Sequence, residues 1–513
     1  MPFRVYITTI GCYSVDAIQS AVSAGLKAID VSLTGHLFAK ANWVLAHHRV
    51  ARYAYTRPEL LDGALHAIFA LNPNIRDLVL GGNSGLGVST RRMAKRAGVQ
   101  ALLSKFPNRL FIEPGDEALT AIYRFSHQST IDPADPSIDE RHLAASIGFW
   151  KTVKTSALLS RCDGMVLFPK LKSNVLSDGF SGAIKLVGIG LLTDQDRLHG
   201  HSQVNNLRMS DMLTLAAPDL IVSDGIEIGW GGNQMTQGAS KLGLILIANN
   251  AVAHDLVATK LLGLETVDHV AIAGKRGLGP TSLDEIEILG CSLAELTAHR
   301  PKSPSGLIPV DRFAERFEHE TGQLFPLEIL AGTPYDAAGN HGIFLDWLYL
   351  SFDHLSTRRQ MARWPNVSVT IGSDWPDPLY PTLFLVGDRA IATFESRFKQ
   401  LSRQRLPHWL WKQLRGIRTR YRYLHPSGTI GTAYAIPGNP PSHRDLIAGF
   451  ALGSRFKMRV SLFRWDLLLE TYGWNLVAQL RSWKNNRYGQ QTFEVMTIPR
   501  IAAKQPVATL VQP

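Results

Sequence analysis

Cysteine is scarce in this chain. Only 3 of its 513 residues are cysteines, Cys12, Cys162 and Cys291, and they lie far apart in the sequence. Because no CxxC pair occurs, a cysteine-rich zinc site and a local iron–sulfur motif are excluded. We therefore expect no iron–sulfur cluster, and we interpret the cysteines as inert thiols.

Long apolar runs are missing as well. No run reaches the roughly 18–20 residues that a membrane-spanning helix needs. The segment from Met1 to Ile7 has a strand-like pattern and lacks the charged and apolar regions of a signal peptide. These two absences favour a cytoplasmic protein. A hydrophobic content of 45% with 19% charged residues is typical of a globular one.

The common catalytic motifs are also absent. The sequence contains no nucleophile elbow, no HExxH pair and no Ser/His/Asp set in a known order. Residues 81–87 form a glycine loop between a predicted strand and a predicted helix, a layout that points backbone N–H groups at an anion. The loop lacks the GK[ST] ending of a P-loop and the third glycine of a dinucleotide fingerprint. Gly82 and Ser84 are therefore candidates for contact with an anionic ligand, and the alternative is a tight turn.

Acidic residues are few in the last part of the chain. Residues 401–513 hold 17 Lys and Arg against 4 Asp and Glu, or +13, whereas residues 1–400 hold 37 against 39, or −2. The stretch 401–425 interleaves arginines with aromatic and aliphatic residues, and we predict a basic amphipathic helix over 407–421. This segment could dock on the body of the protein, or bind an acidic protein or an anionic membrane surface. Nucleic acid is a weaker candidate because the interleaving occurs only once.

What the sequence does contain is an alternation of apolar runs with helical patterns. Strands are predicted at 3–10, 36–45, 77–80, 164–168, 219–223, 243–248, 269–273, 285–289, 366–371, 383–386 and 455–465, and the helices include 181–189 and 251–262. This alternation predicts an α/β fold in which helices cover mainly parallel or mixed sheets.

Two stretches predict boundaries between domains. Residues 126–140 are polar and contain prolines, and residues 300–340 are rich in proline and glycine. We therefore predict two α/β lobes that flank a cleft and a basic α+β region after them, with a disordered tail after about residue 500. The predicted bounds are 1–130 and 141–300 for the lobes and 301–513 for the basic region.

Three apolar runs in the second predicted lobe stop at polar residues. The runs 164–168, 219–223 and 243–248 are followed by lysines, by an aspartate-glycine motif and by a polar helix start. In α/β folds the carboxyl ends of strands deliver side chains to one cleft. The candidates after these runs are Lys170, Lys172, Lys185, Asp224, Glu227, Asn233 and Asp255, and the first lobe adds Lys40 and Asn42.

These side chains allow several chemistries. Lysines that converge on one cleft favour a carboxylate or phosphate ligand, and a desolvated lysine can also act as a base or nucleophile. Solvated surface lysines are the alternative. The carboxylates could act as general acids or bases, or hold Mg²⁺ or Ca²⁺ together with Asn233, Asn249 and Asn250. The alternative is that these residues simply cap helices, as Asn250 would. His199 and His201 could bind a metal, transfer a proton or lie at the surface.

The ordered series of motifs resembles the domain of unknown function 362 family over roughly residues 30–290. The elements that carry the resemblance are 38–42, 55–59, 81–85, Pro169-Lys170-Leu171-Lys172, Gly182-Ala183-Ile184-Lys185, His199 or His201, Asp224-Gly225 with Gly231-Gly232-Asn233, and residues 249–255. Ala41 replaces a proline of the family pattern, and Asn249-Asn250 replaces an aspartate-proline pair. The resemblance implies a fold and the outline of a site but no reaction, because the family has no established biochemical role.

Together these patterns predict an enzyme that binds a small anionic ligand between two lobes and uses acid/base or divalent-metal-assisted chemistry. The catalytic candidates are Lys170, Lys172, Asp224, Glu227 and His201. The substrate-binding candidates are Lys40, Asn42, Gly82, Ser84, Lys185, Asn233 and Asp255. The alternative is a non-catalytic accessory protein that docks a redox partner or an anionic membrane through residues 401–425. A divalent cation is the only cofactor that these residues suggest.

Overall fold

The computed structural model divides the chain into two compact units. Unit 1 comprises Met1–Ser305 and Glu470–Pro513, and unit 2 comprises Gly306–Leu469. The structure describes residues 2–46, 51–84, 89–125, 152–174, 180–190, 202–230, 237–264, 267–296, 314–315, 318, 322, 324–325, 327–332, 344, 366–405, 419–438, 441, 446, 449, 474–489, 491–495 and 508–510.

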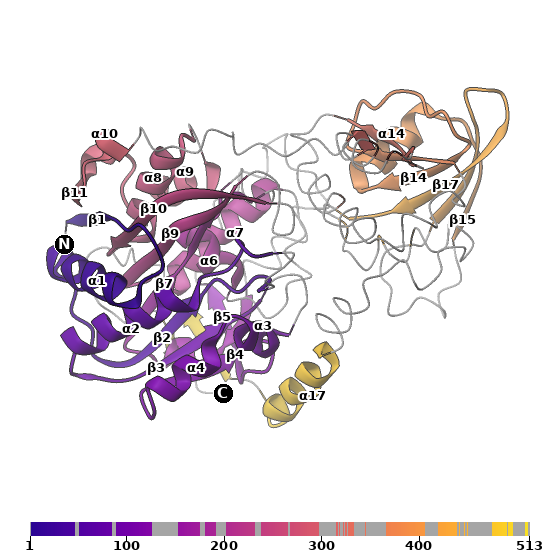
Figure 1. Cartoon of the computed structure of the whole chain (residues 1–513). Helices are drawn as coiled ribbons and strands as arrows, with labels where there is room; N and C mark the ends of the chain where they lie inside the picture. The colour runs from indigo at the N-terminus through magenta and orange to yellow at the C-terminus, as the bar shows by residue number, and fades with distance from the viewer. Residues whose placement is uncertain are drawn as a thin grey trace. The chain divides into compact units, whose positions relative to one another are not determined.

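Unit 1 is built on a nine-stranded mixed sheet (Figure 1). Its strands are β1 (Phe3–Thr9), β2 (Gly35–Ala41), β3 (Ile75–Gly82), β4 (Leu110–Pro114), β7 (Gly164–Phe168), β8 (Lys170–Lys172), β9 (Leu220–Trp230), β10 (Gly238–Ala248) and β11 (Ile286–Gly290). The order is β11-β1-β10-β9-β7-β2-β3-β4, and β8 pairs with β9. Neighbours from β4 to β9 run parallel, whereas β10 is antiparallel to both β9 and β1. The carboxyl ends of these parallel strands therefore lie at the same end of the sheet.

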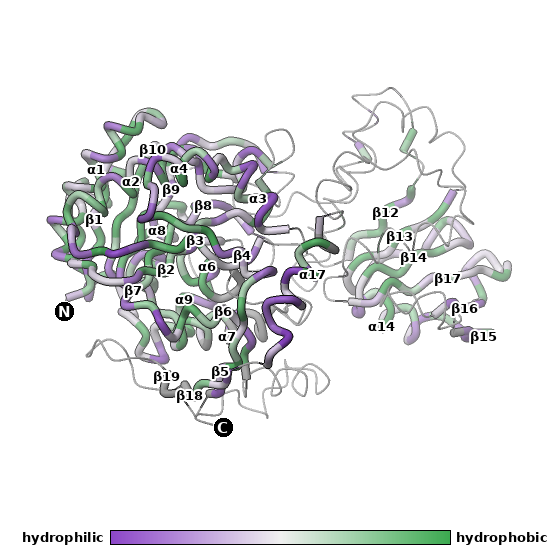
Figure 2. Tube along the Cα trace, turned by 90° about the horizontal axis from the view of Figure 1, so that it is seen from below, coloured by the Kyte–Doolittle hydropathy of each residue, from purple (hydrophilic) through white to green (hydrophobic). Residues whose placement is uncertain are grey.

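Helices cover both faces of this sheet, and each face buries its own core. One core includes residues of α1 (Val15–Ile29), α2 (Pro58–Leu71) and α4 (Val99–Lys105). The other includes residues of α6 (Ala183–Gly190), α7 (Ser202–Leu215), α8 (Ala251–Leu262) and α9 (Asp268–Lys275). In Figure 2 the strands at the centre of unit 1 are largely hydrophobic, as expected for a sheet that is buried on both sides.

Local signals start and stop these helices. The Ser14 hydroxyl accepts a hydrogen bond from Ala17 N at the start of α1, and Pro58 occupies the first turn of α2, where a missing N–H costs nothing. Asn250 caps the start of α8, and Gly263 ends it with a φ of +73°, a conformation that favours glycine. Such short-range signals explain why the predicted helix at 251–262 is confirmed at both ends.

The end of the chain returns to unit 1 in a second sheet. This sheet has the order β19-β18-β5-β6. Its strands are β5 (Thr120–Phe125), β6 (Thr152–Ser156), β18 (Gln491–Val495) and β19 (Ala508–Leu510). The rings of Tyr123 and Phe493 stack with centroids 5.3 Å apart where β18 runs parallel to β5. Of the tail for which we expected disorder, 508–510 form β19, and the rest lies outside the described residues.

Unit 2 contains a six-stranded sheet with the order β12-β13-β14-β17-β16-β15. The strands are β12 (Leu327–Ala331), β13 (Val367–Ile371), β14 (Thr382–Val386), β15 (Gln400–Arg405), β16 (Thr419–Leu424) and β17 (Ile430–Ile436). The first four in that order are parallel, and β16 and β15 continue the sheet antiparallel. Phe394 of α14 (Asp388–Arg397) packs against Tyr421 and Tyr423 of β16 in the core of this unit.

The α/β prediction is confirmed, and several finer predictions are corrected. The two predicted lobes share the nine-stranded sheet, because β2 of the first pairs directly with β7 of the second. The strand predicted at 269–273 is wrong: these residues lie in α9, where the buried residues His269, Val270, Ala273 and Gly274 follow a helical period. A short apolar run does not distinguish the 3.6-residue period of a helix from the two-residue period of a strand.

Two predictions concern the basic region. Residues 419–421 of the predicted helix at 407–421 belong to β16, and the rest of that helix lies outside the described residues, as does the strand predicted at 455–465.

Among the helices that the structure describes, none has the length and apolarity to cross a membrane.

Candidate functional site

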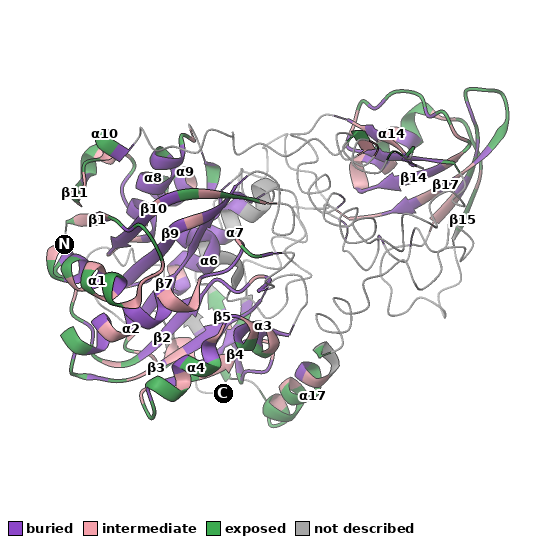
Figure 3. Cartoon of the chain, viewed as in Figure 1, coloured by how far each residue is buried: buried purple, intermediate pink, exposed green. Residues whose placement is uncertain are grey.

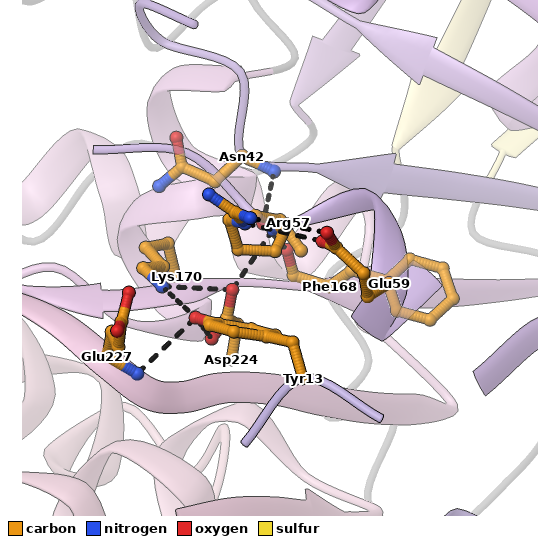
Figure 4. A network of polar contacts seen from close by, with 9 residues as sticks. Tyr13, Asn42, Arg57, Glu59, Phe168, Lys170, Asp224 and Glu227 are labelled. Atoms are coloured by element: carbon orange, nitrogen blue, oxygen red, sulfur yellow. Dashed lines mark hydrogen bonds and ion pairs between the residues drawn. The ribbon is translucent and has the colours of Figure 1, made fainter. Parts of the chain in front are cut away.

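A buried ion pair lies just beyond the end of β7, where β8 pairs with the middle of β9 (Figure 4). Lys170 opens β8, and its register partner in β9 is Asp224. The Lys170 Nζ atom lies 2.9 Å from Asp224 Oδ2, and the two side chains are 1% and 0% exposed. Pro169 separates β7 from β8, and its carbonyl accepts a hydrogen bond from Asp224 N at 2.8 Å. The chain thereby aligns the two charged side chains.

Tyr13 and Arg57 complete this group, which we call the Lys170 cluster (Tyr13, Arg57, Lys170, Asp224 and Glu227). The Tyr13 hydroxyl donates to Asp224 Oδ1 at 2.8 Å and accepts from Lys170 Nζ at 2.9 Å. Arg57 N donates to Asp224 Oδ2 at 3.0 Å, and Glu227 N donates to the Tyr13 hydroxyl at 3.3 Å. Asp224 thus has hydrogen-bond donors from three residues, which together hold its carboxylate in place.

Burial governs the protonation of the Lys170 cluster. It raises the pKa of Tyr13, with the charge of Asp224 acting in the same direction, so this phenol stays neutral. Burial also lowers the pKa of Lys170, against the opposing attraction of Asp224. A lysine whose pKa is lowered beside a carboxylate is a group that can exchange a proton.

A second buried group surrounds Lys40, which we call the Lys40 cluster (Lys40, Trp43, Asn83, Thr90 and Asp116). Lys40 lies in β2 and is 1% exposed. Its Nζ atom donates to the carbonyl of Asn83, just after β3, at 2.7 Å and lies 5.9 Å from the centre of the Trp43 ring. Within the described residues, no carboxylate forms an ion pair with Lys40 within 4.0 Å. This ammonium group is therefore buried without a direct counterion from that part of the chain.

Two further polar atoms of the Lys40 cluster have no hydrogen-bond partner among the described residues: Trp43 Nε1, a donor, and Asp116 Oδ1, an acceptor. The other oxygen of Asp116 accepts from Thr90 N at 3.0 Å. Burial lowers the pKa of Lys40 to about 7, with Asp116 acting in the opposite direction, and burial raises the pKa of Asp116. The Lys40 cluster thus combines an amine near neutrality with a donor and an acceptor that a ligand or water would satisfy.

Strand alternation directs the side chains of Lys40 and Asp224 to opposite faces of the sheet, although Trp43 of the Lys40 cluster belongs to the core beneath α1 and α2. Lys40 shares a face of β2 with Phe38, which belongs to the core beneath α6, α7 and α8. Asp224 shares a face of β9 with Val222 and Ile226, which belong to the core beneath α1 and α2. The structure therefore brings Lys170 together with Asp224 and Glu227, and it places Lys40 on the opposite face at the same end of the strands.

Asp255 lies in α8, and its carboxylate caps the start of α6. Its two carboxylate oxygens accept from Ala183 N at 2.8 Å and from Ile184 N at 2.9 Å, and His254 Nδ1 lies 2.6 Å from Oδ1. The other ring nitrogen of His254 contacts the Ser223 hydroxyl on β9. Because these three side chains are fully buried, they join β9, α8 and α6 within the fold. Contact of Asp255 with substrate remains a prediction.

The other predicted residues are mostly buried near these groups. Lys172 and Lys185 are 1% and 8% exposed, Glu227 is half-buried, and Asn42 bonds through its backbone N–H to Thr56 Oγ1 at 3.2 Å. Gly82 adopts a φ of +85°, which favours glycine, as the chain leaves β3, and the buried Ser84 donates its backbone N–H to Thr90 Oγ1 at 2.9 Å. Residues 85–87, His199, His201 and Asn233 lie outside the described residues.

No metal centre is evident in the described parts of the chain, where no group of three or more His, Cys, Asp and Glu side chains could hold an ion. Cys12, Cys162 and Cys291 are all described, and they form no disulfide. A divalent cation held by carboxylates such as Asp224 and Glu227 together with Asn233, or a metal bound by the two histidines of the 199–201 loop, remains a prediction, because Asn233 and both histidines lie outside the described residues.

Sequence reasoning missed Tyr13, Arg57, Trp43 and Asp116. Arg57 stands in the stretch 55–59 that carried the family resemblance, so its position was visible in the sequence, although its role was not. Tyr13 follows β1, which is separated from β9 by the single strand β10, and its hydroxyl reaches Asp224 across that strand order. Only the strand order shows this proximity, since 211 positions separate the two residues.

Comparison with known proteins supports the resemblance found in the motifs. None of the curated proteins matches the chain. Residues 38–260 match the model of a family described as Domain of unknown function (DUF362). The match includes Lys40, Lys170, Asp224 and Asp255, whereas Tyr13 precedes it. Residues 38–260, less than half of the 513-residue chain, are thus similar to the DUF362 family.

Proposed function

We propose that this protein is an enzyme that binds a small anionic ligand, a carboxylate or a phosphate, at the Lys40 cluster. The observation that carries the proposal is the buried Lys40 ammonium, which forms no ion pair within the described residues. Burying a charge without a counterion costs several kcal/mol. An anionic ligand would supply the counterion, and Trp43 Nε1 offers a further donor. Gly82 and Ser84 are the candidate backbone contacts beside it.

Acid/base chemistry follows from the pKa of Lys40. At a pKa of about 7 the amine and the ammonium are both populated near neutral pH, so Lys40 can accept a proton from a bound substrate and return it. A bound anion favours the ammonium and raises this pKa again. In this proposal Lys170, Lys172, Asp224, Glu227 and His201 remain the other catalytic candidates. Lys185, Asn42, Asn233 and Asp255 remain candidates for binding.

Two further parts of the proposal are a divalent cation as a cofactor and a cytoplasmic location. The oxygen-rich set of Asp224, Glu227 and Asn233 supports the choice of Mg²⁺ or Ca²⁺ over zinc, because these ions prefer oxygen ligands. The small number of cysteines in the sequence is consistent with the proposed cytoplasmic location.

Ligand-induced thermal stabilisation tests the proposal. We expect at least one of inorganic phosphate, acetate and malonate to raise the Tm of the wild-type protein, since a ligand at about 100 times its Kd contributes about 2.7 kcal/mol. Lys40→Met should remove this response and keep the fold, because Lys40 takes part in no ion pair among the described residues. The matched control is Lys241→Met, which replaces an exposed lysine of β10.

Lys170→Ala should also abolish the response if both clusters serve one ligand. A wild-type-like shift in Lys40→Met would contradict the proposal, and so would the failure of every anion to stabilise the wild type. Normal stabilisation of Lys170→Ala with a lost response in Lys40→Met would restrict the ligand to the Lys40 cluster.

The alternative function is docking of an acidic protein or an anionic membrane surface through residues 401–425. The observation that favours it is the position of β15 at one edge of the unit 2 sheet, with Leu401 47% exposed and Arg403 exposed. An edge strand presents unpaired backbone groups to a partner. Association through this segment should weaken steeply with ionic strength, and salt-insensitive association would argue against it.

A further inference from the structure

Helix α17 (Asn475–Asn486) is fixed to unit 1 along one side. Arg481 NH1 lies 3.1 Å from Glu117 Oε1, and Glu117 also accepts from Arg91. Asn485 and Asn486 donate to the carbonyls of Glu117 and Ala118 at 2.6 and 3.0 Å. These polar contacts, together with the buried Ala478, determine which side of the helix faces the protein.

Large apolar side chains are exposed on the opposite side of α17. Figure 3 shows α17 largely in the colour of exposed residues. Leu480 is 60% exposed, Trp483 is 70% exposed, and Tyr488, just after the helix, is 85% exposed. Leu480 and Trp483 are three positions apart and therefore neighbours on one side of the helix. Exposed tryptophan and leucine side by side are unusual on a surface that meets only water.

The charge around these side chains has a single sign. Residues 475–489 include Arg481, Lys484 and Arg487 and no acidic residue. Arg481 is paired with Glu117, whereas Lys484 and Arg487 are exposed and form no ion pair with any described residue. The Arg487 guanidinium lies 4.5 Å from the centre of the Tyr488 ring. The exposed side of α17 thus combines apolar and aromatic groups with unneutralised cations.

We infer that this side of α17 docks on an anionic phospholipid surface. Tryptophan and tyrosine favour the interface between water and the bilayer, where the ring is apolar and its polar atom remains hydrated. Lysine and arginine beside them are attracted to acidic headgroups, with the helix lying in the plane of the interface. An acidic protein fits the charge, but lysine is depleted in the cores of protein interfaces. The inference is independent of the ligand site proposed above.

Vesicle flotation of the full-length protein tests the inference. We expect it to float with vesicles that contain phosphatidylglycerol and phosphatidylcholine, and not with phosphatidylcholine alone, and to dissociate as salt rises. The double variant Leu480→Ala/Trp483→Ala should lower the partition coefficient at least about tenfold. Lys484→Glu/Arg487→Glu should remove the preference for acidic lipid. Neither variant changes the contacts with Glu117 and Ala118, so the fold is expected to remain.

A matched control is Leu379→Ala, which removes an exposed leucine of unit 2 that is 65% exposed. This variant should bind vesicles like the wild type. The inference is overturned if the wild type does not float, if it binds neutral and acidic vesicles equally, or if the α17 variants bind normally. It is also overturned if sedimentation shows a dimer that Leu480→Ala/Trp483→Ala dissociates, since a second copy would then cover this side.

Discussion

The Asp224 carboxylate illustrates how a buried charge is held at the end of a sheet. Taking a carboxylate and an ammonium out of water costs several kcal/mol for each ion, and their attraction offsets this cost only when further hydrogen bonds are made. Asp224 accepts such hydrogen bonds from the Tyr13 hydroxyl and from Arg57 N, in addition to its ion pair with Lys170. The loss of one partner would leave an uncompensated charge, so Tyr13 acts as a structural partner of Lys170 whatever the reaction is.

Lys40 should make the stability of unit 1 depend on pH. Its pKa is about 7 in the folded protein, against an ordinary value of 10.5. Between these values the unfolded chain holds a proton that the folded chain lacks, so the free energy of unfolding rises with pH by up to about 1.4 kcal/mol per unit. Below about pH 7 Lys40 is protonated in both the folded and the unfolded chain. Burial of its charge then lowers the free energy of unfolding by its full amount.

The variant Lys40→Met removes this dependence. We therefore expect the stability of the wild type relative to Lys40→Met to improve by about 1–2 kcal/mol between about pH 7 and pH 8.5. Urea unfolding at several pH values measures the difference. Lys241→Met, which replaces an exposed lysine, should differ from the wild type by the same amount at every pH. Parallel curves for the wild type and Lys40→Met would show that Lys40 titrates normally.

At the scale of elements, Asp255 connects two helices. It lies in α8, and its carboxylate accepts the first two backbone N–H groups of α6. The close approach needs a glycine before α6, because a Cβ on Gly182 would lie 2.2 Å from Asp255 Oδ1. Since α6 carries Lys185, the same contact fixes a binding candidate relative to the sheet.

Asp255→Asn should loosen the start of α6. Asparagine keeps a single acceptor oxygen for two N–H groups, so we expect a loss of about 1–3 kcal/mol in stability. Hydrogen exchange measured by mass spectrometry should rise in peptides that cover 180–190, and it should stay unchanged in β13 of unit 2. The control Asp16→Asn replaces an exposed acid in the first turn of α1 and should change stability by less than about 0.5 kcal/mol. Unchanged exchange in 180–190 would mean that α6 does not depend on this cap.

The elements also show what the sequence could predict. The bounds of α8 could be predicted because Asn250 and Gly263 act locally. The predicted end of the strand at residue 223 was wrong, since β9 continues through Asp224 to Trp230 while its pairing with β10 shifts between Lys241 and Leu244. The membership of Tyr13 and Arg57 in the site depends on strand order, which no local pattern encodes.

At the scale of the whole molecule, unit 1 is discontinuous in sequence. Residues 470–513 supply α17 and the strands β18 and β19, and β18 pairs with β5. The sequence predicted one basic region from 301 to the end because the excess of basic residues spans it. Charge composition predicts properties of the protein surface, but it does not predict to which sheet a strand belongs. The contacts of Asn486 with Thr120 and of Phe493 with Tyr123 decide that membership.

Deleting unit 2 should therefore leave unit 1 folded, provided that the C-terminal segment is kept. We would join residues 1–305 to 470–513 through a Gly/Ser linker of about 20 residues, which spans roughly 25 Å on average. This protein should protect β5 from hydrogen exchange as the full chain does. A chain that ends at residue 305 should lose that protection, because it lacks the hydrogen bonds to β18 and an aromatic stack that contributes about 0.5–1.5 kcal/mol. Equal protection of β5 in both proteins would mean that the return of the chain contributes nothing to unit 1, and loss in both would make unit 2 essential for its folding.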